Sequence, residues 1–195
     1  MIMKKVAFLI CLFSILYNAG FTQENHLTFK GIPIDGSVES FAAKLKQDGY
    51  TEEYISDNGT MVLKGQFANE DCGIFLLPTP QTKTIWKVAV IFDKKYTSWS
   101  SIKTDFNKFK DLFAKKYGKL THDYHFFSSP YYEGDGYEMS ALELDKCRYW
   151  ASFEMPEGYI SIKLISPGQI ALGYEDKVNS ALETKESEKR ALDDI

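Results

Sequence analysis

Two segments of the chain place hydrophobic residues every three or four positions, the spacing that gives an α-helix one apolar face. In the first, Ser37 is placed as an N-cap and Gly49 follows the last apolar residue, so we expect a helix between them. The second runs from Ser98 to Gly118. Its apolar stripe consists of Trp99, Ile102, Phe106, Phe109, Phe113 and Tyr117. Such stripes are typical of helices that lie across a sheet.

The other apolar positions alternate with polar ones or form short runs, as strands do. Residues 160–164 alternate, the pattern of a sheet with one buried and one wet face. Asn58-Gly59 predicts a tight turn between two strands. A short helix within 139–146 and a final helix from Val178 complete the prediction. The expected strands cover residues 27–34, 61–67, 72–77, 85–92, 120–127, 147–153, 159–165 and 169–174.

These elements predict an α+β fold in which helices pack on a mainly antiparallel sheet. The side chains of Phe106, Phe109 and Phe113 should then be buried against one of two groups of strand residues. The candidate groups are Trp86, Val88 and Val90, or Ile160, Ile162 and Leu164.

The order of a helix followed by several strands occurs twice, which predicts a duplicated helix-plus-strands unit. The repeats would cover about residues 27–93 and 97–182, within one compact domain. Phe41 of the first expected helix then corresponds to Phe109 of the second.

Residues 1–22 have the three parts of a secretory signal peptide. Two lysines precede an apolar stretch from 6 to 16, and a polar exit with small residues follows. The apolar stretch is shorter than the roughly 20 residues that span a bilayer. Cleavage is therefore favoured over a membrane anchor and over a lipoprotein signal at Cys11. We expect export to the periplasm or the cell surface, and a single α+β domain over residues 23–195.

The charge of the expected mature chain narrows the classes of partner. The leader carries two of the 23 basic residues and none of the 27 acidic ones, so the remainder has a formal charge of −6. An acidic chain without a basic cluster is unsuited to nucleic acid and to anionic membrane surfaces. We expect an envelope protein or a glycan as partner, no nucleic acid, and no stable membrane insertion after cleavage.

Two cysteines remain once Cys11 leaves with the leader, namely Cys72 and Cys147. Each stands at the start of an expected strand, in similar places of the two repeats. Because exported proteins fold in an oxidising compartment, we expect a disulfide between them. The alternative is two buried thiols.

Four segments carry a resemblance to known proteins: residues 29–36, 86–92, 98–118 and 141–147. They resemble a group of small exported proteins from gut-dwelling Gram-negative bacteria, and the resemblance spans most of the mature chain. It implies export and a repeat of helix and sheet. It implies no catalytic residue.

The sequence contains no recognised catalytic or cofactor motif. It lacks the G-x-S-x-G nucleophile elbow, the H-E-x-x-H zinc motif, the phosphate loop and the dinucleotide fingerprint. His122 and His125 could share a metal on a helix, but on the expected strand they point to opposite faces. Glu133, Asp135 and Glu138 lack the spacing of an EF-hand. We expect no catalytic residue, no metal site and no cofactor.

Residues 127–137 combine turn formers with three tyrosines, Tyr131, Tyr132 and Tyr137. Tyrosine suits recognition because its rigid ring gives apolar contact while its hydroxyl stays hydrated. We therefore expect these tyrosines to contact a partner, and the alternative is that they cover one end of the sheet. The expected function is a non-catalytic binding protein, with an enzyme inhibitor as one form. The alternative function is an exported hydrolase that uses acidic residues on glycans or peptides.

Overall fold

The computed structural model describes residues 25–195, so the expected signal peptide over residues 1–22 lies outside the described residues. Ten strands and four helices follow one another in the described part, which confirms the α+β class. The elements are β1 (Thr28–Phe29), β2 (Ile32–Pro33), α1 (Val38–Gln47), β3 (Thr51–Ile55), β4 (Met61–Phe67), β5 (Glu70–Pro78), β6 (Ile85–Phe92), α2 (Trp99–Tyr117), β7 (His122–Phe127), α3 (Glu138–Glu143), β8 (Cys147–Met155), β9 (Gly158–Ile165), β10 (Gln169–Asp176) and α4 (Lys177–Asp193).

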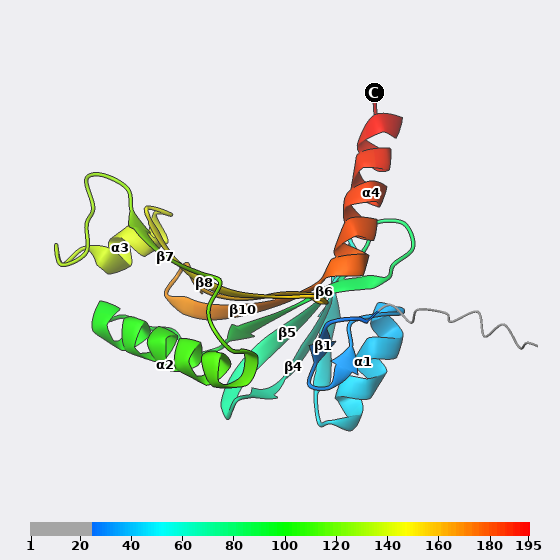
Figure 1. Cartoon of the computed structure of the whole chain (residues 1–195), viewed down its shortest axis with the longest axis horizontal. Helices are drawn as coiled ribbons and strands as arrows, with labels where there is room; N and C mark the ends of the chain where they lie inside the picture. The colour runs from blue at the N-terminus through cyan, green and yellow to red at the C-terminus, as the bar shows by residue number, and fades with distance from the viewer. Residues whose placement is uncertain (1–24) are drawn as a thin grey trace, which may run out of the picture.

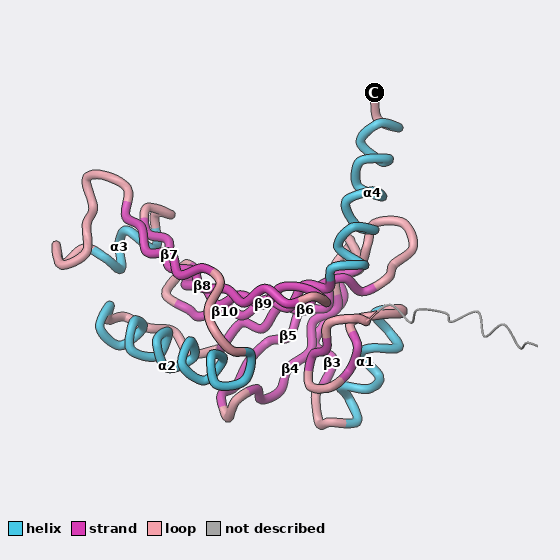
Figure 2. Tube along the Cα trace, in the orientation of Figure 1, coloured by secondary structure: helices cyan, strands magenta, loops and turns pink. Residues whose placement is uncertain are grey.

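Eight strands form one antiparallel sheet in the order β3-β4-β5-β6-β10-β9-β8-β7, and Figure 2 shows them as a continuous layer. Strands β3 to β6 form one meander and β7 to β10 form a second. The two meanders join where β6 pairs with β10, so that Val90 lies opposite Leu172. Each meander follows a helix, α1 or α2, and α3 lies between β7 and β8 in the chain.

The helices cover the two sides of the sheet unequally. Helices α1 and α2 lie on the same side, and α4 leaves the end of β10 and extends on the opposite side (Figure 1). The short helix α3 contacts β8 and β9 near the edge formed by β7. The side with α1 and α2 therefore holds the main core.

Local sequence signals explain where several elements begin and end. The Ser37 hydroxyl oxygen accepts a hydrogen bond from the backbone N–H of Ser40 at 3.2 Å and so caps α1. Gly59, in the turn between β3 and β4, has a φ of 88°, a conformation that glycine adopts at little cost. The expected first strand over residues 27–34 is wrong as one element, because a turn divides it into β1 and β2.

Phe106, Phe109 and Phe113 are buried between α2 and the sheet, as expected. The ring of Phe109 stacks on Phe92 of β6 with centroids 4.6 Å apart, and α2 also contacts β9 and β10. Trp86, one of the expected partners, is only half-buried. The pairing between β5 and β6 shifts register beside Trp86, so this residue falls outside the alternation of the strand.

Cys72 and Cys147 form no disulfide, so that expectation is wrong. Cys72 lies on β5 and Cys147 on β8, with β6, β10 and β9 between them. Four strand spacings put them about 19 Å apart, whereas bridged cysteines have Cα atoms within about 7 Å. The expectation that the two cysteines occupy similar places in the two repeats is also wrong, because β5 is the third strand of its meander and β8 is the second. Burial raises the pKa of the Cys72 thiol to about 11 and that of Cys147 to about 12.

Candidate functional site

The side of the sheet away from α1 and α2 carries a group of aromatic side chains. Successive residues of a strand point to opposite faces. In β8, Tyr149 packs on Phe106 of α2, and Trp150 therefore points the other way. We call this second side the open face. Its aromatic residues on β7, β8 and β9, here called the aromatic row, are His122, Tyr124, Phe126, Trp150 and Tyr159.

Ring contacts join the aromatic row along and across the strands. The His122 and Trp150 rings stack with centroids 5.6 Å apart. Tyr124 and Phe126 stack at 6.0 Å, and Trp150 lies 6.1 Å from Tyr159. Tyr124 nevertheless keeps 47% of its surface exposed. The aromatic row therefore presents apolar ring surface to solvent at the β7 edge.

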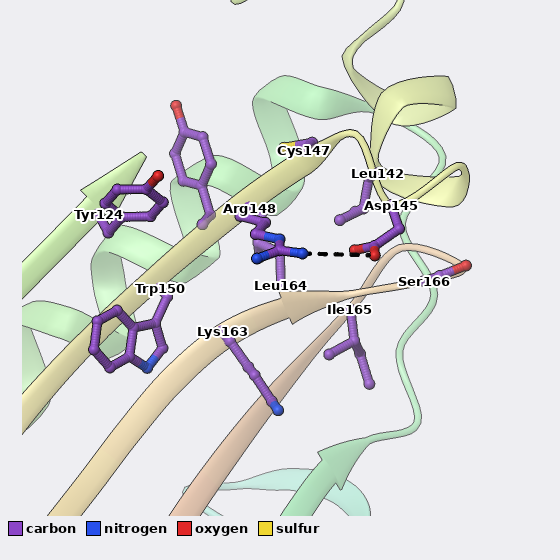
Figure 3. A pocket seen from close by; sticks show the side chains of 11 residues that line it. Tyr124, Leu142, Asp145, Cys147, Arg148, Trp150, Lys163, Leu164, Ile165 and Ser166 are labelled. Carbon is purple, nitrogen blue, oxygen red and sulfur yellow. Dashed lines mark ion pairs between the residues drawn. The ribbon is translucent and has the colours of Figure 1, made fainter. Parts of the chain in front are cut away.

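A surface cavity of about 740 Å³ adjoins the aromatic row (Figure 3). Tyr124 and Trp150 lie along one side of this cavity and Ile165 along the other, while Leu142 from α3 lies at one end. The other lining residues are Asp145, Cys147, Arg148, Tyr149, Lys163, Leu164 and Ser166. Most of the exposed lining is apolar, with a few charged groups among it.

Two basic side chains line the cavity, and they differ in their ionic partners. Arg148 lies 3.9 Å from Asp145, with both side chains largely exposed, so the pair stabilises little (Figure 3). Within residues 25–195, no carboxylate forms an ion pair with Lys163. Lys163 is exposed on β9, and partial desolvation together with the nearby Lys87 ammonium lowers its pKa. Lys87 itself pairs with Glu175 at 3.1 Å.

Three carboxyl groups elsewhere have pKa values below their ordinary range, and each has a structural partner. Glu133 ion-pairs with Lys103 and accepts a hydrogen bond from the Tyr149 hydroxyl at 2.8 Å. Asp105 ion-pairs with Lys94 at 2.7 Å. The third, Glu186, binds the loop between β5 and β6. A general acid near neutral pH needs a raised pKa, so these three groups are unsuited to that role.

The three tyrosines expected to contact a partner fall into two environments. Tyr131 is half-buried and packs against the core, as a covering residue would. Tyr132 and Tyr137 are each 64% exposed. Asp135 holds the loop between them, because its carboxylate accepts hydrogen bonds from the backbone N–H groups of Tyr132 and Tyr137 at 3.0 and 2.7 Å. Glu138 accepts another from the N–H of Gly134 at 2.8 Å.

The two histidines of β7 point to opposite faces, as expected. His122 stacks on Trp150 of the open face, whereas His125 stacks on Tyr149 with centroids 4.2 Å apart. The rings therefore cannot share a ligand. Residues 25–195 contain no group of three or more His, Cys, Asp and Glu side chains arranged to hold a metal ion.

Sequence reasoning did not select Tyr124, Trp150 or Lys163. The signal that could have found Tyr124 is alternation, because Tyr124 and Phe126 flank His125 in β7 and therefore share the opposite face. Aromatic residues stand at both kinds of position in β7, however, and the pattern alone does not identify the covered face. The docking of α2 on Tyr149 decides it.

Comparisons of the chain with protein-family models, curated proteins and solved structures gave no match. In the described part of the chain, no helix is both long enough and apolar enough to cross a membrane. The geometry of the open face is therefore the main guide to function.

Proposed function

We propose that this chain is an exported, non-catalytic binding protein that captures a partner protein through the open face at its β7 edge. The observation that carries the proposal is the aromatic row beside the cavity of about 740 Å³, in which Tyr124 and Phe126 are exposed and Trp150 is half-buried. An inhibitor of an envelope enzyme is one form that this function can take. Export is part of the proposal and is supported by the signal-like composition of residues 1–22.

The chemistry of the aromatic row favours protein recognition. Tyrosine and tryptophan are enriched among the residues that dominate interface energy, because their rigid rings bury a large area at a small cost in side-chain entropy. Tyr124 lies opposite Trp150 in the pairing of β7 with β8, so both rings belong to one patch. Truncation of such a residue commonly weakens binding by about 2 kcal/mol or more, roughly 30-fold.

The exposed tyrosines of the preceding loop extend the proposed contact. Tyr132 and Tyr137 lie just before α3, and Leu142 of α3 lines the cavity. The loop, α3 and the β7 edge lie together at one end of the molecule (Figure 1). We infer that Tyr132 and Tyr137 touch the periphery of the partner, whereas Tyr131 covers the core.

A duplication is also part of the proposal. A helix followed by a four-stranded meander occurs twice, and the two meanders join edge to edge at β6 and β10. In both halves the helix buries aromatic residues on the same side, Phe41 from α1 and Phe109 from α2. Joining two such units yields one wide sheet, and on its side away from α1 and α2 the helix α4 contacts β6, β9 and β10.

Two matched tyrosine variants test the binding proposal. Tyr124 on β7 and Tyr54 on β3 are 47% and 50% exposed and lie on the two opposite edge strands. The mature protein, its Tyr124→Ala variant and its Tyr54→Ala variant would each be immobilised and exposed to the same envelope extract. We expect Tyr124→Ala to lose the bound protein that the parent retains, and Tyr54→Ala to keep it.

Thermal unfolding of the three proteins provides the control for stability. Exposed side chains contribute little to stability, so the unfolding temperatures should agree within a few degrees. Equal capture by both variants would show that the β7 end of the open face is not the contact. Turnover of a glycan or peptide by the parent protein would support the hydrolase alternative instead.

A further inference from the structure

The cavity beside the aromatic row contains a positive charge that the fold itself leaves uncompensated. Three other basic residues of the open face have acidic neighbours: Lys64 pairs with Asp93 at 2.8 Å, Lys87 with Glu175 and Arg148 with Asp145. Lys163 has no such partner within residues 25–195. The chain as a whole has 27 acidic and 23 basic residues. Among the four basic residues on the strands of the open face, Lys163 is thus the one without an acidic partner in the described part of the chain.

The side chains around Lys163 indicate which chemical group a bound anion would carry next to its charge. Trp150 lies directly opposite Lys163 in the pairing of β8 with β9. Ile165 and Leu142 line the same cavity, and most of its exposed lining is apolar. Figure 3 shows the Lys163 side chain extending from β9 with its ammonium directed away from the Trp150 ring. A ligand that fits must present a negative group beside an apolar one.

We propose that this cavity binds an acidic segment of the partner protein, in which a carboxylate pairs with Lys163 and an adjacent apolar side chain packs against Trp150. This inference rests on the proposed binding function of the open face. An oxyanion brought to the exposed ammonium forms a charge-assisted hydrogen bond. The apolar side chain covers ring surface that is otherwise wet.

The electrostatics of the cavity agree with this occupant. Partial desolvation and the charge of Lys87 both lower the pKa of Lys163, which means that both disfavour its charged form. A bound carboxylate offsets both effects. The Arg148 and Asp145 charges compensate each other, as do those of Lys87 and Glu175, so the cavity keeps a net positive charge.

A protein segment fits the lining better than a carboxylated sugar does. Sugar hydroxyl groups need several hydrogen-bonding side chains, and binding sites place such groups at defined positions. Here most of the exposed lining is apolar, with Leu142, Leu164 and Ile165 among the lining residues. An acidic glycan is therefore an outcome of the test that would count against the proposal.

Two small probes and two lysine variants test the inference. The probes are the acetylated dipeptide amide glutamyl-phenylalanine and its glutaminyl analogue, which differ only in charge. Their binding to the mature protein would be followed through the indole N–H signal of Trp150 in proton–nitrogen correlation spectra. We expect weak, saturable binding of the acidic probe, with a Kd of about 1 mM, and roughly tenfold weaker binding of the glutaminyl analogue.

Lys163→Gln should abolish this difference, so that both probes bind with the lower affinity. Lys64→Gln is the matched control, because Lys64 lies on the open face but pairs with Asp93; this variant should keep the tenfold preference. Equal binding of the two probes by the parent, or a preference that survives Lys163→Gln, would overturn the inference. Stronger binding of methyl glucuronide than of the acidic dipeptide would overturn it as well.

Failure of the inference and failure of the proposed function give different results. If Tyr124→Ala loses the partner while Lys163→Gln keeps the charge preference of the probes, the open face binds a partner but Lys163 does not bind a carboxylate. If Tyr124→Ala captures the partner as well as the parent does, the binding proposal itself fails whatever the probes show.

Discussion

Replacing Phe109 with alanine tests how α2 is held on the sheet. The side chain is 5% exposed, and its ring stacks on Phe92 of β6 at 4.6 Å. Removing it deletes most of a buried aromatic side chain and leaves a cavity that the sheet can fill only in part. Such changes commonly cost about 3 to 5 kcal/mol of unfolding free energy. We expect a loss in this range.

Leu112 provides the matched control on the same helix. It is 44% exposed, so Leu112→Ala should change the unfolding free energy by no more than about 0.5 kcal/mol. Urea unfolding, followed by circular dichroism, would measure both variants, with an unchanged m-value showing that the unfolded states are comparable. A loss below about 1 kcal/mol for Phe109→Ala would mean that the helix does not dock as described.

A double-mutant cycle isolates the contact between the two rings. The single variants Phe92→Ala and Phe109→Ala and their combination should show a coupling of about 0.5 to 1.5 kcal/mol, the contribution of an aromatic pair beyond burial. Additive effects would indicate that the two residues stabilise the core separately. The stacking geometry predicts coupling.

Three further predictions concern other parts of the chain. Burial opposes ionisation of Glu186, but hydrogen bonds from Thr82 and Gln81 outweigh burial and lower its pKa. The Glu186 carboxylate therefore stabilises the fold at neutral pH, and this contribution disappears as pH falls below about 4.5. Glu186→Gln should therefore cost about 1 to 3 kcal/mol at pH 7 and little at pH 3, as urea unfolding at both values would show. Alkylation after denaturation without reductant should label both Cys72 and Cys147, and protection of either would contradict their separation across the sheet. Mass spectrometry of the exported protein should find a new N-terminus between residues 20 and 24, and an intact leader would refute the signal prediction.

The type and order of most elements could be predicted because the signals are local. The stripe of α2 and the alternation in β9 each lie within a few consecutive turns or residues. The first strand failed for a local reason as well, since a turn at residues 30 and 31 divides it.

The arrangement of the strands could not be predicted in the same way. Pairing of β6 with β10 joins residues about 80 positions apart, and no short pattern specifies such a contact. The expected bridge between Cys72 and Cys147 assumed that similar places in two repeats lie close together. The actual order inserts three strands between them.

The candidate site also depends on contacts between residues that are distant in the chain. Tyr132 and Tyr137 could be selected because turn formers and tyrosines are adjacent in the chain. The cavity depends on Tyr124, Trp150 and Lys163, which come from three strands and meet only through register. Periodicity locates residues on faces, but the choice of the covered face follows from helix docking.

Hydroxyl-radical footprinting in the presence of the captured partner tests the central claim most directly, because it measures the solvent exposure of individual side chains. We expect oxidation of Tyr124 and Phe126 to slow several-fold when the partner is added, while oxidation of Tyr54 on the opposite edge strand stays unchanged. Unchanged oxidation of Tyr124, together with slower oxidation on α1 or β3, would place the partner elsewhere and contradict a binding role for the aromatic row.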